Sequence, residues 1–232
     1  MRFTKAFTSL AVAGVLAVGA SACGGNEDAP AADRAMTSSK TASTSSGAPS
    51  PKTPAADLRV TLDRLLGEHA HLAIAATQKG YAGQRDFKQV AAALDRNSVE
   101  LADAIGSVYG PDAREEFLNG GSKWRDHIGF FVDYTVAKAK NDQAGQKQAV
   151  RDLMGYVASF STFLAKATGL PQSALQKTIT THVMQLKGQL DAYAAGDHGK
   201  SARFTRDAYA HMFMTGDTLA GAIVEQSPDD FR

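Results

Sequence analysis

The stretches HIGFFVDYTVAKAKND, from His127 to Asp142, and HVMQLKGQLDAYAAGD, from His182 to Asp197, decide the fold. Each begins with a histidine in a run whose apolar residues recur every three or four positions, which is the period of an amphipathic helix. Each ends with an aspartate 15 residues later, in a polar turn. The two stretches align without a gap, which predicts two helical hairpins of one kind.

A third, looser copy begins at His69, so that the three repeat histidines (His69, His127 and His182) are 58 and 55 positions apart. Gly110-Pro111 and Gly169-Leu170-Pro171 separate the units, because glycine ends a helix readily and proline suits the first turn of the next. A repeat of this length corresponds to one supersecondary unit. Ala- and Asp-rich helices also align through composition alone, so the repeat is a hypothesis at this point.

The predicted fold is all-α: a six-helix antiparallel bundle built from three helical-hairpin repeats, over residues 55–228. Two small bundles that share a seam are the alternative. The Asn119-Gly120-Gly121-Ser122 segment lies within the third predicted helix, where paired glycines cost about 2 kcal/mol relative to alanine, so we expect a kink or a short break there. The predicted helices are 55–79, 87–109, 112–140, 144–168, 172–195 and 200–226.

The N-terminus has the pattern of a bacterial export signal that ends at the single cysteine, Cys23. Its apolar run is about 15 residues long, which is shorter than the roughly 20 that span a bilayer. Ala20-Ser21-Ala22 precedes Cys23 as in a prolipoprotein lipobox, with alanine in place of the usual leucine. We predict a signal peptide over 1–22 and a lipidated, palmitate-bearing Cys23 that anchors the chain on the extracytoplasmic face of the cell membrane. A secreted protein with a free thiol is the alternative.

Residues 23–54 are predicted to be a disordered linker, because Ser, Thr, Ala, Pro and Gly dominate and cannot bury enough apolar surface to offset the ordering entropy. The formal net charge of +1, without a basic stripe, argues against a nucleic-acid partner. No P-loop or nucleophile motif marks a reaction. We therefore predict a binding or interaction module for an unknown protein or small ligand, without enzymatic activity; an enzyme of unknown class is an alternative.

The repeat histidines all face apolar neighbours on their helices, and an unpartnered buried polar group costs about 1–3 kcal/mol. Each ring therefore needs a partner. In a structural role, that partner would be a tyrosine, an aspartate or a backbone carbonyl. The candidate side chains are Asp133, Asp191, Tyr134 and Tyr193. The alternative is a metal or haem site, with copper or zinc as the metal, since imidazole together with thioether suits copper(I). Its candidate ligands are His69, His127, His182, His211 and Met214.

Several short motifs carry a family resemblance: Leu65-Leu66-x-Glu68-His69, Ala104-Ile105-x-x-Val108-Tyr109-Gly110, Trp124-Arg125-Asp126-His127-Ile128 with Asp133-Tyr134, and Ala208-Tyr209-x-His211-Met212 through Thr215-Gly216-Asp217 to Ile223. On these, the stretch from Leu58 to Phe231 resembles a poorly characterised family of secreted or lipoprotein all-helical domains of Gram-positive bacteria. Some members carry the label "copper amine oxidase" through an attached domain that is absent here. That oxidase needs an Asn-Tyr-Asp/Glu cofactor tyrosine and a β-rich domain, so the resemblance implies the helical fold and not the activity.

Replacing Cys23 with serine removes the predicted lipid acceptor. In a bacterial host that processes lipoproteins, we expect labelled palmitate in the wild-type chain and none in Cys23→Ser, which should leave the membrane fraction because its acyl chains are lost. Ser43→Ala, a change of the same kind in the linker, should keep the label. An unlabelled wild-type chain, or a labelled Cys23→Ser, would contradict lipidation.

Overall fold

The computed structural model describes residues 51–121 and 124–232, and their regular structure is entirely helical. The predicted signal peptide, Cys23 and most of the predicted linker lie outside these residues. Among the described residues, no helix combines the length and the apolar character needed to span a bilayer. The helices are α1 (Pro54–Tyr81), α2 (Phe87–Tyr109), α3 (Pro111–Asn119), α4 (Trp124–Ala139), α5 (Gln143–Thr168), α6 (Gln172–Ala194), α7 (His198–Gln226) and the short 3-10 helix η1 (Pro228–Phe231).

The ends of these helices follow from capping chemistry. Thr53 precedes α1, and its hydroxyl oxygen accepts a hydrogen bond from the backbone N–H of Ala56 at 3.1 Å. Gly110, with a φ of +89°, ends α2, and Pro111 begins α3 at once. Gly169, in the left-handed conformation, ends α5. The predicted all-α bundle is confirmed, and five of the six predicted helices differ from the observed ones by at most two residues at each end.

The third predicted helix, 112–140, is two helices in the structure. Gly120, with an extended ψ of −158°, ends α3 beside Gly121, so the expected break is present. Phe117 of α3 then stacks on Trp124, the first residue of α4, with 4.7 Å between the ring centroids. The break thereby packs the side chain of Trp124 into the interior, where it is 4% exposed.

The turns of the three hairpins share one geometry. A residue with positive φ lies 14 positions after each repeat histidine, and these residues are Gly83, Asn141 and Gly196. The next residue donates its backbone N–H to a carbonyl five positions back: Gln84 to Lys79 (2.9 Å), Asp142 to Ala137 (2.8 Å) and Asp197 to Ala192 (2.9 Å). Asp142 and Asp197 then cap α5 and α7. The histidine-to-turn register is thus common to all three hairpins; that they are copies of one unit stays a prediction.

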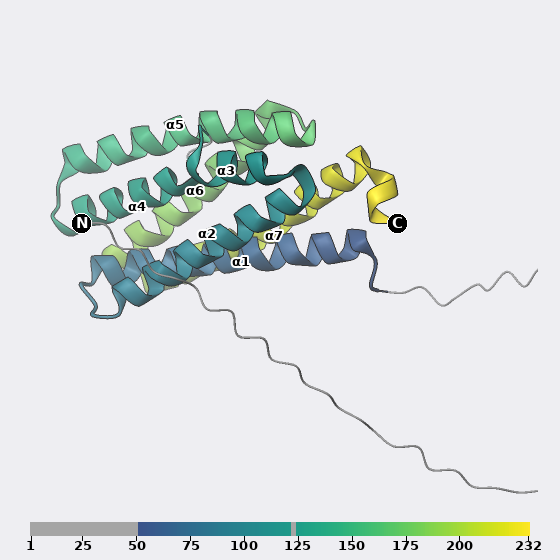
Figure 1. Cartoon of the computed structure of the whole chain (residues 1–232). Helices are drawn as coiled ribbons and strands as arrows, with labels where there is room; N and C mark the ends of the chain where they lie inside the picture. Colours follow the sequence, from purple (N-terminus) through teal and green to yellow (C-terminus); the bar gives the residue numbers. More distant parts are fainter. Residues whose placement is uncertain (1–50, 122–123) are drawn as a thin grey trace, which may run out of the picture. The chain divides into compact units, whose positions relative to one another are not determined.

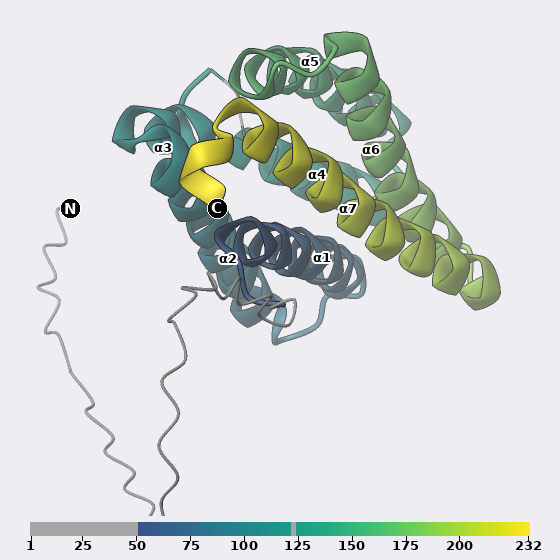
Figure 2. The same ribbon diagram turned by 90° about the vertical axis from the view of Figure 1, so that its right-hand side faces the viewer.

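Helix α1 lies at the centre of the assembly and packs against α2, α4, α6 and α7. Helices α1 and α7 pack closely because each carries a glycine at their contact, Gly67 on α1 and Gly216 on α7. A Cβ atom on Gly67 would overlap the Phe213 ring, and one on Gly216 would overlap Asp63. All three hairpin turns lie at one end of the helical unit, on the left in Figure 1. Figure 2 shows the α1–α2 pair beneath α7, with α5 and α6 on the far side of α7.

Candidate functional site

The three repeat histidines meet in the interior. His69 comes from α1, His127 from α4 and His182 from α6, and their exposed fractions are 1%, 2% and 7%. The ring centroid of His69 lies 5.5 Å from that of His127 and 5.8 Å from that of His182. His69 is therefore the central member of a histidine cluster, defined here as these three rings.

A backbone carbonyl, one of the suggested partners, is confirmed for His127. The side-chain partners are wrong, since none of the four binds a repeat histidine in the structure: Asp133, Asp191, Tyr134 and Tyr193. Tyr134 donates its hydroxyl to Asp191 at 2.8 Å, and the ammonium groups of Lys138 and Lys187 also bind Asp191, each at 2.6 Å. Asp133 is exposed, and Tyr193 lies beside His198, with 5.9 Å between the ring centroids. Tyr134 and Lys138 of α4 thus form a separate ion-pair cluster with Lys187 and Asp191 of α6.

Aromatic rings surround the histidine cluster instead. His127 stacks on Tyr156 with 4.4 Å between centroids and 16° between planes. Trp124 lies 4.9 Å from His69 and 4.7 Å from His127, again between centroids. Tyr156 was missed by sequence reasoning, because a tyrosine in an amphipathic helix carries no motif that separates it from ordinary core.

The hydrogen bonds of the cluster are incomplete within the described residues. Nδ1 of His127 bonds the backbone oxygen of Trp124. A carbonyl oxygen only accepts, so Nδ1 carries the hydrogen and Nε2 presents a lone pair. Both ring nitrogens of His69 and both of His182 have no partner. Each unpaired buried group costs about 1–3 kcal/mol, so the cluster is energetically suited to receiving another molecule.

Burial determines the charge of the cluster. It lowers the pKa of His69 to about 3, with a further contribution from His127, and it lowers the pKa of His127 to about 3, with a further contribution from His182. The pKa of His182 is also far below its ordinary value, mainly because of burial. The rings are therefore neutral near pH 7 and offer hydrogen-bond donors and acceptors without charge.

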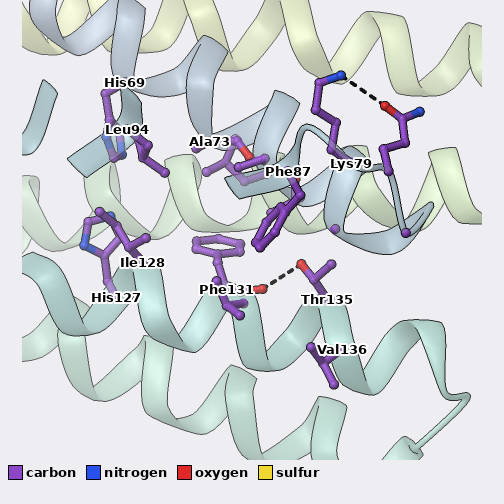
Figure 3. Close-up of a pocket in the computed structure, with 17 residues that line it drawn as sticks. His69, Ala73, Lys79, Phe87, Leu94, His127, Ile128, Phe131, Thr135 and Val136 are labelled. Carbon is purple, nitrogen blue, oxygen red and sulfur yellow. Dashed lines mark hydrogen bonds between the residues drawn. The ribbon is translucent and has the colours of Figure 1, made fainter. Parts of the chain in front are cut away.

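Two cavities adjoin the cluster, and His69 and His127 line both. The larger cavity, of about 280 Å³, lies between α1 and α4 and is bordered by the beginning of α2 and the α1–α2 turn. Figure 3 shows His69 and His127 at one end of it, with Lys79 and Val136 toward the other. Its walls are mainly apolar, with Ala73, Phe87, Leu94, Ile128 and Phe131 among them. The smaller cavity, of about 60 Å³, also touches His182, His211, Trp124 and Tyr156.

The two remaining metal candidates lie outside the cluster. His211 borders the smaller cavity, but its Nε2 bonds the backbone oxygen of Thr178 at 2.9 Å. Met214 is 60% exposed on the surface of α7. Across residues 51–121 and 124–232, no group of three or more His, Cys, Asp or Glu side chains is arranged to hold a metal ion.

The chain matches no family model, no curated protein and no solved structure. The family resemblance described above stays a prediction, and the function has to be argued from the site.

Acid should destabilise the fold through the histidine cluster. A histidine in the unfolded chain has a pKa near 6.5, whereas His69 and His127 in the folded protein have pKa values of about 3. Between these pH values the unfolded chain binds protons that the folded protein does not bind. The free energy of unfolding therefore falls as the pH drops from about 6.5 to about 3. The expected slope is up to about 1.4 kcal/mol per pH unit for each ring. Urea unfolding at a series of pH values below 7 measures it.

Two variants separate this cause from general acid sensitivity. His182→Phe should reduce the slope, because one buried imidazole is gone. His198→Gln, at an exposed position in the first turn of α7, should leave the slope unchanged. Equal slopes in all three proteins would show that the cluster does not determine the acid response.

Proposed function

We propose that this protein is a lipid-anchored extracytoplasmic binding protein whose helical domain takes up a small, mainly apolar molecule. The observation that carries the proposal is the cavity of about 280 Å³ that ends at two neutral, buried imidazoles. Ligand sites in proteins are typically concave and mostly apolar, with a few polar groups that fix orientation. We call this cavity, from His69 and His127 to Val136, the binding pocket.

The walls favour an occupant. The walls of this solvent-open pocket are mainly apolar, and an apolar ligand that covers them removes that surface from water. Ala73 and Ala76 form part of the wall from α1, and their small side chains leave the space open. At the outer end, Val132 and Val136 are 39% and 44% exposed, which provides a path from solvent.

The charged residues that line the pocket do not favour a charged ligand. Lys79 is the only Lys, Arg, Asp or Glu among the described residues that line the pocket. Its ammonium group already binds Asp86 at 2.7 Å and Gln84 at 3.0 Å, which ties down the α1–α2 turn. A neutral ligand therefore suits the pocket, since it would leave this ion pair intact.

The proposal is for binding without turnover. A general base works best when its pKa lies near the working pH, and the pKa values of His69 and His127 are about 3. None of the hydrogen bonds that the described residues make to the repeat histidines comes from a serine or a carboxylate, so no activated nucleophile is paired with them. The predicted lipid at Cys23 and the linker after it would hold the pocket close to the membrane, where apolar molecules accumulate.

Filling the pocket should weaken binding without harming the fold. N-phenyl-1-naphthylamine, a neutral apolar dye that becomes fluorescent in apolar surroundings, should bind the mature chain lacking its lipid. Ala73→Leu places three more carbon atoms in the pocket and should weaken binding by roughly tenfold or more while keeping or raising the urea midpoint. Ala92→Leu, on the exposed face of α2, is the matched control. Equal binding by both variants, or none by the wild type, would count against the pocket.

A copper or zinc site is the second candidate, favoured by the contact of three neutral imidazoles with unpaired nitrogens. The hydrogen bond from His127 Nδ1 to a backbone carbonyl is an arrangement that commonly orients metal-binding histidines. Convergence on one ion would require the rings to turn, because no group in the described residues is now arranged to hold a metal.

Metal titration decides this second candidate. If it holds, the wild-type chain should bind one zinc or copper(I) ion more tightly than micromolar, and a His127→Ala/His182→Ala double variant should lose that binding. Met214→Leu should keep it, because Met214 lies on the surface. Weaker binding than micromolar, or undiminished binding in the double variant, would eliminate the metal site.

A further inference from the structure

We propose that the inner end of the binding pocket recognises a hydroxyl group, so that the ligand is a neutral alcohol or phenol with an apolar body. His69 and His127 would bind the two sides of that hydroxyl, one ring donating and the other accepting. The inference rests on the proposed function and adds the chemical class of the ligand to it.

The first support is the fixed tautomer of His127. Its Nδ1–H is committed to the backbone oxygen of Trp124, which leaves the lone pair of Nε2 as the free polar atom of the ring. Trp124 begins α4 and is held by its stack on Phe117, so this carbonyl lies in a fixed place. The pocket therefore contains a hydrogen-bond acceptor that needs a donor from the ligand.

The second support is His69, whose two nitrogens are both buried and unpartnered. A neutral imidazole has one N–H and one lone pair, so His69 can supply the donor that His127 cannot. Figure 3 shows the two rings on facing helices at the same end of the pocket. Their centroids are 5.5 Å apart, and neither nitrogen of His69 bonds to His127, so a ligand atom can bridge the two.

The hydroxyl and ammonium groups in the pocket are already engaged. The Thr77 hydroxyl donates to the carbonyls of Ala73 and Ile74, and the Thr135 hydroxyl donates to the carbonyl of Phe131. Lys79 is held by Gln84 and Asp86. At the inner end of the pocket, the two imidazoles are therefore the polar side chains that can orient a ligand whose body lies between Phe87 and Phe131 (Figure 3).

A hydroxyl satisfies this pair with one atom, because it donates and accepts at once. An ether or a ketone only accepts, so it would leave the lone pair of His127 unpaired. A carboxylate also only accepts, and it would bring a charge into a pocket whose one lining ammonium group is already paired. An ammonium group only donates, so it would leave the N–H of His69 without an acceptor.

Three compounds of nearly the same size test this: 4-butylphenol, 4-butylanisole and 4-butylbenzoate. Calorimetry on the mature chain lacking its lipid gives the affinities, and the emission of Trp124, the only tryptophan, reports occupancy because it contacts both rings. We expect the phenol to bind roughly tenfold or more tightly than the other two, because each of those leaves a buried polar group unpaired. His127→Phe should bring the phenol and the anisole to similar affinity, whereas His211→Phe, which lies outside the pocket, should keep the difference.

Each outcome has one meaning. Equal affinity for all three compounds would overturn hydroxyl recognition while leaving the apolar pocket in place. Tighter binding of the benzoate would overturn it in favour of an anion site. No binding of these compounds or of the apolar dye would overturn the proposed function itself. If His127→Phe fails to fold, the imidazole ¹⁵N shifts of the wild type decide: a His127 that is not protonated on Nδ1 alone, or that does not respond to the phenol, would overturn the inference.

Discussion

Three ionisable rings are buried together, and their burial lowers their pKa values so that they are neutral near pH 7. Asp191, the carboxylate of the ion-pair cluster, is no counter-charge for them, because it already pairs with Lys138 and Lys187. The interior can therefore carry hydrogen-bonding chemistry but not charge. This constraint governs the rest of the site: the apolar walls, the paired ammonium group at the rim and the unfilled hydrogen bonds are all consistent with a neutral guest.

The convergence of the histidines follows from register. Each lies ten residues before the carbonyl that closes its hairpin turn, which is about 15 Å along a helix. Because the three turns lie at one end of the helical unit, equal spacing brings the rings to one level (Figure 1). Because α4 and α6 both pack on α1, His127 and His182 then lie next to His69. A sequence spacing that seemed to concern only the fold thus also sets the geometry of the site.

Most of the fold could be predicted from the sequence, because its determinants are local. Periodic apolar residues, Gly110-Pro111 and the polar turns specify the helices within a residue or two, and Gly120-Gly121 specifies the break before Trp124. The site could be predicted only in part. Spacing showed that each repeat histidine faces the interior, but which helix faces meet depends on distant contacts. The pairing of Tyr134 with Asp191, the stack of Tyr156 on His127 and the cavity walls arise from such contacts. The predicted side-chain partners of the histidines were therefore wrong, whereas the predicted backbone carbonyl was found for His127.

The central place of α1 has a consequence for how the molecule is made. A chain that is synthesised from its N-terminus delivers α1 first and α7 last, yet these two helices pack closely together. Arg59 pairs with Asp217 across 158 positions of sequence, and Gly67 meets Phe213. The apolar face of α1 is therefore fully covered only after nearly the whole domain has been synthesised. Contacts between residues so distant in sequence slow folding, and they leave apolar surface exposed until they form. Assembly of this small helical domain is thus completed only when its final helix is available to pack on α1.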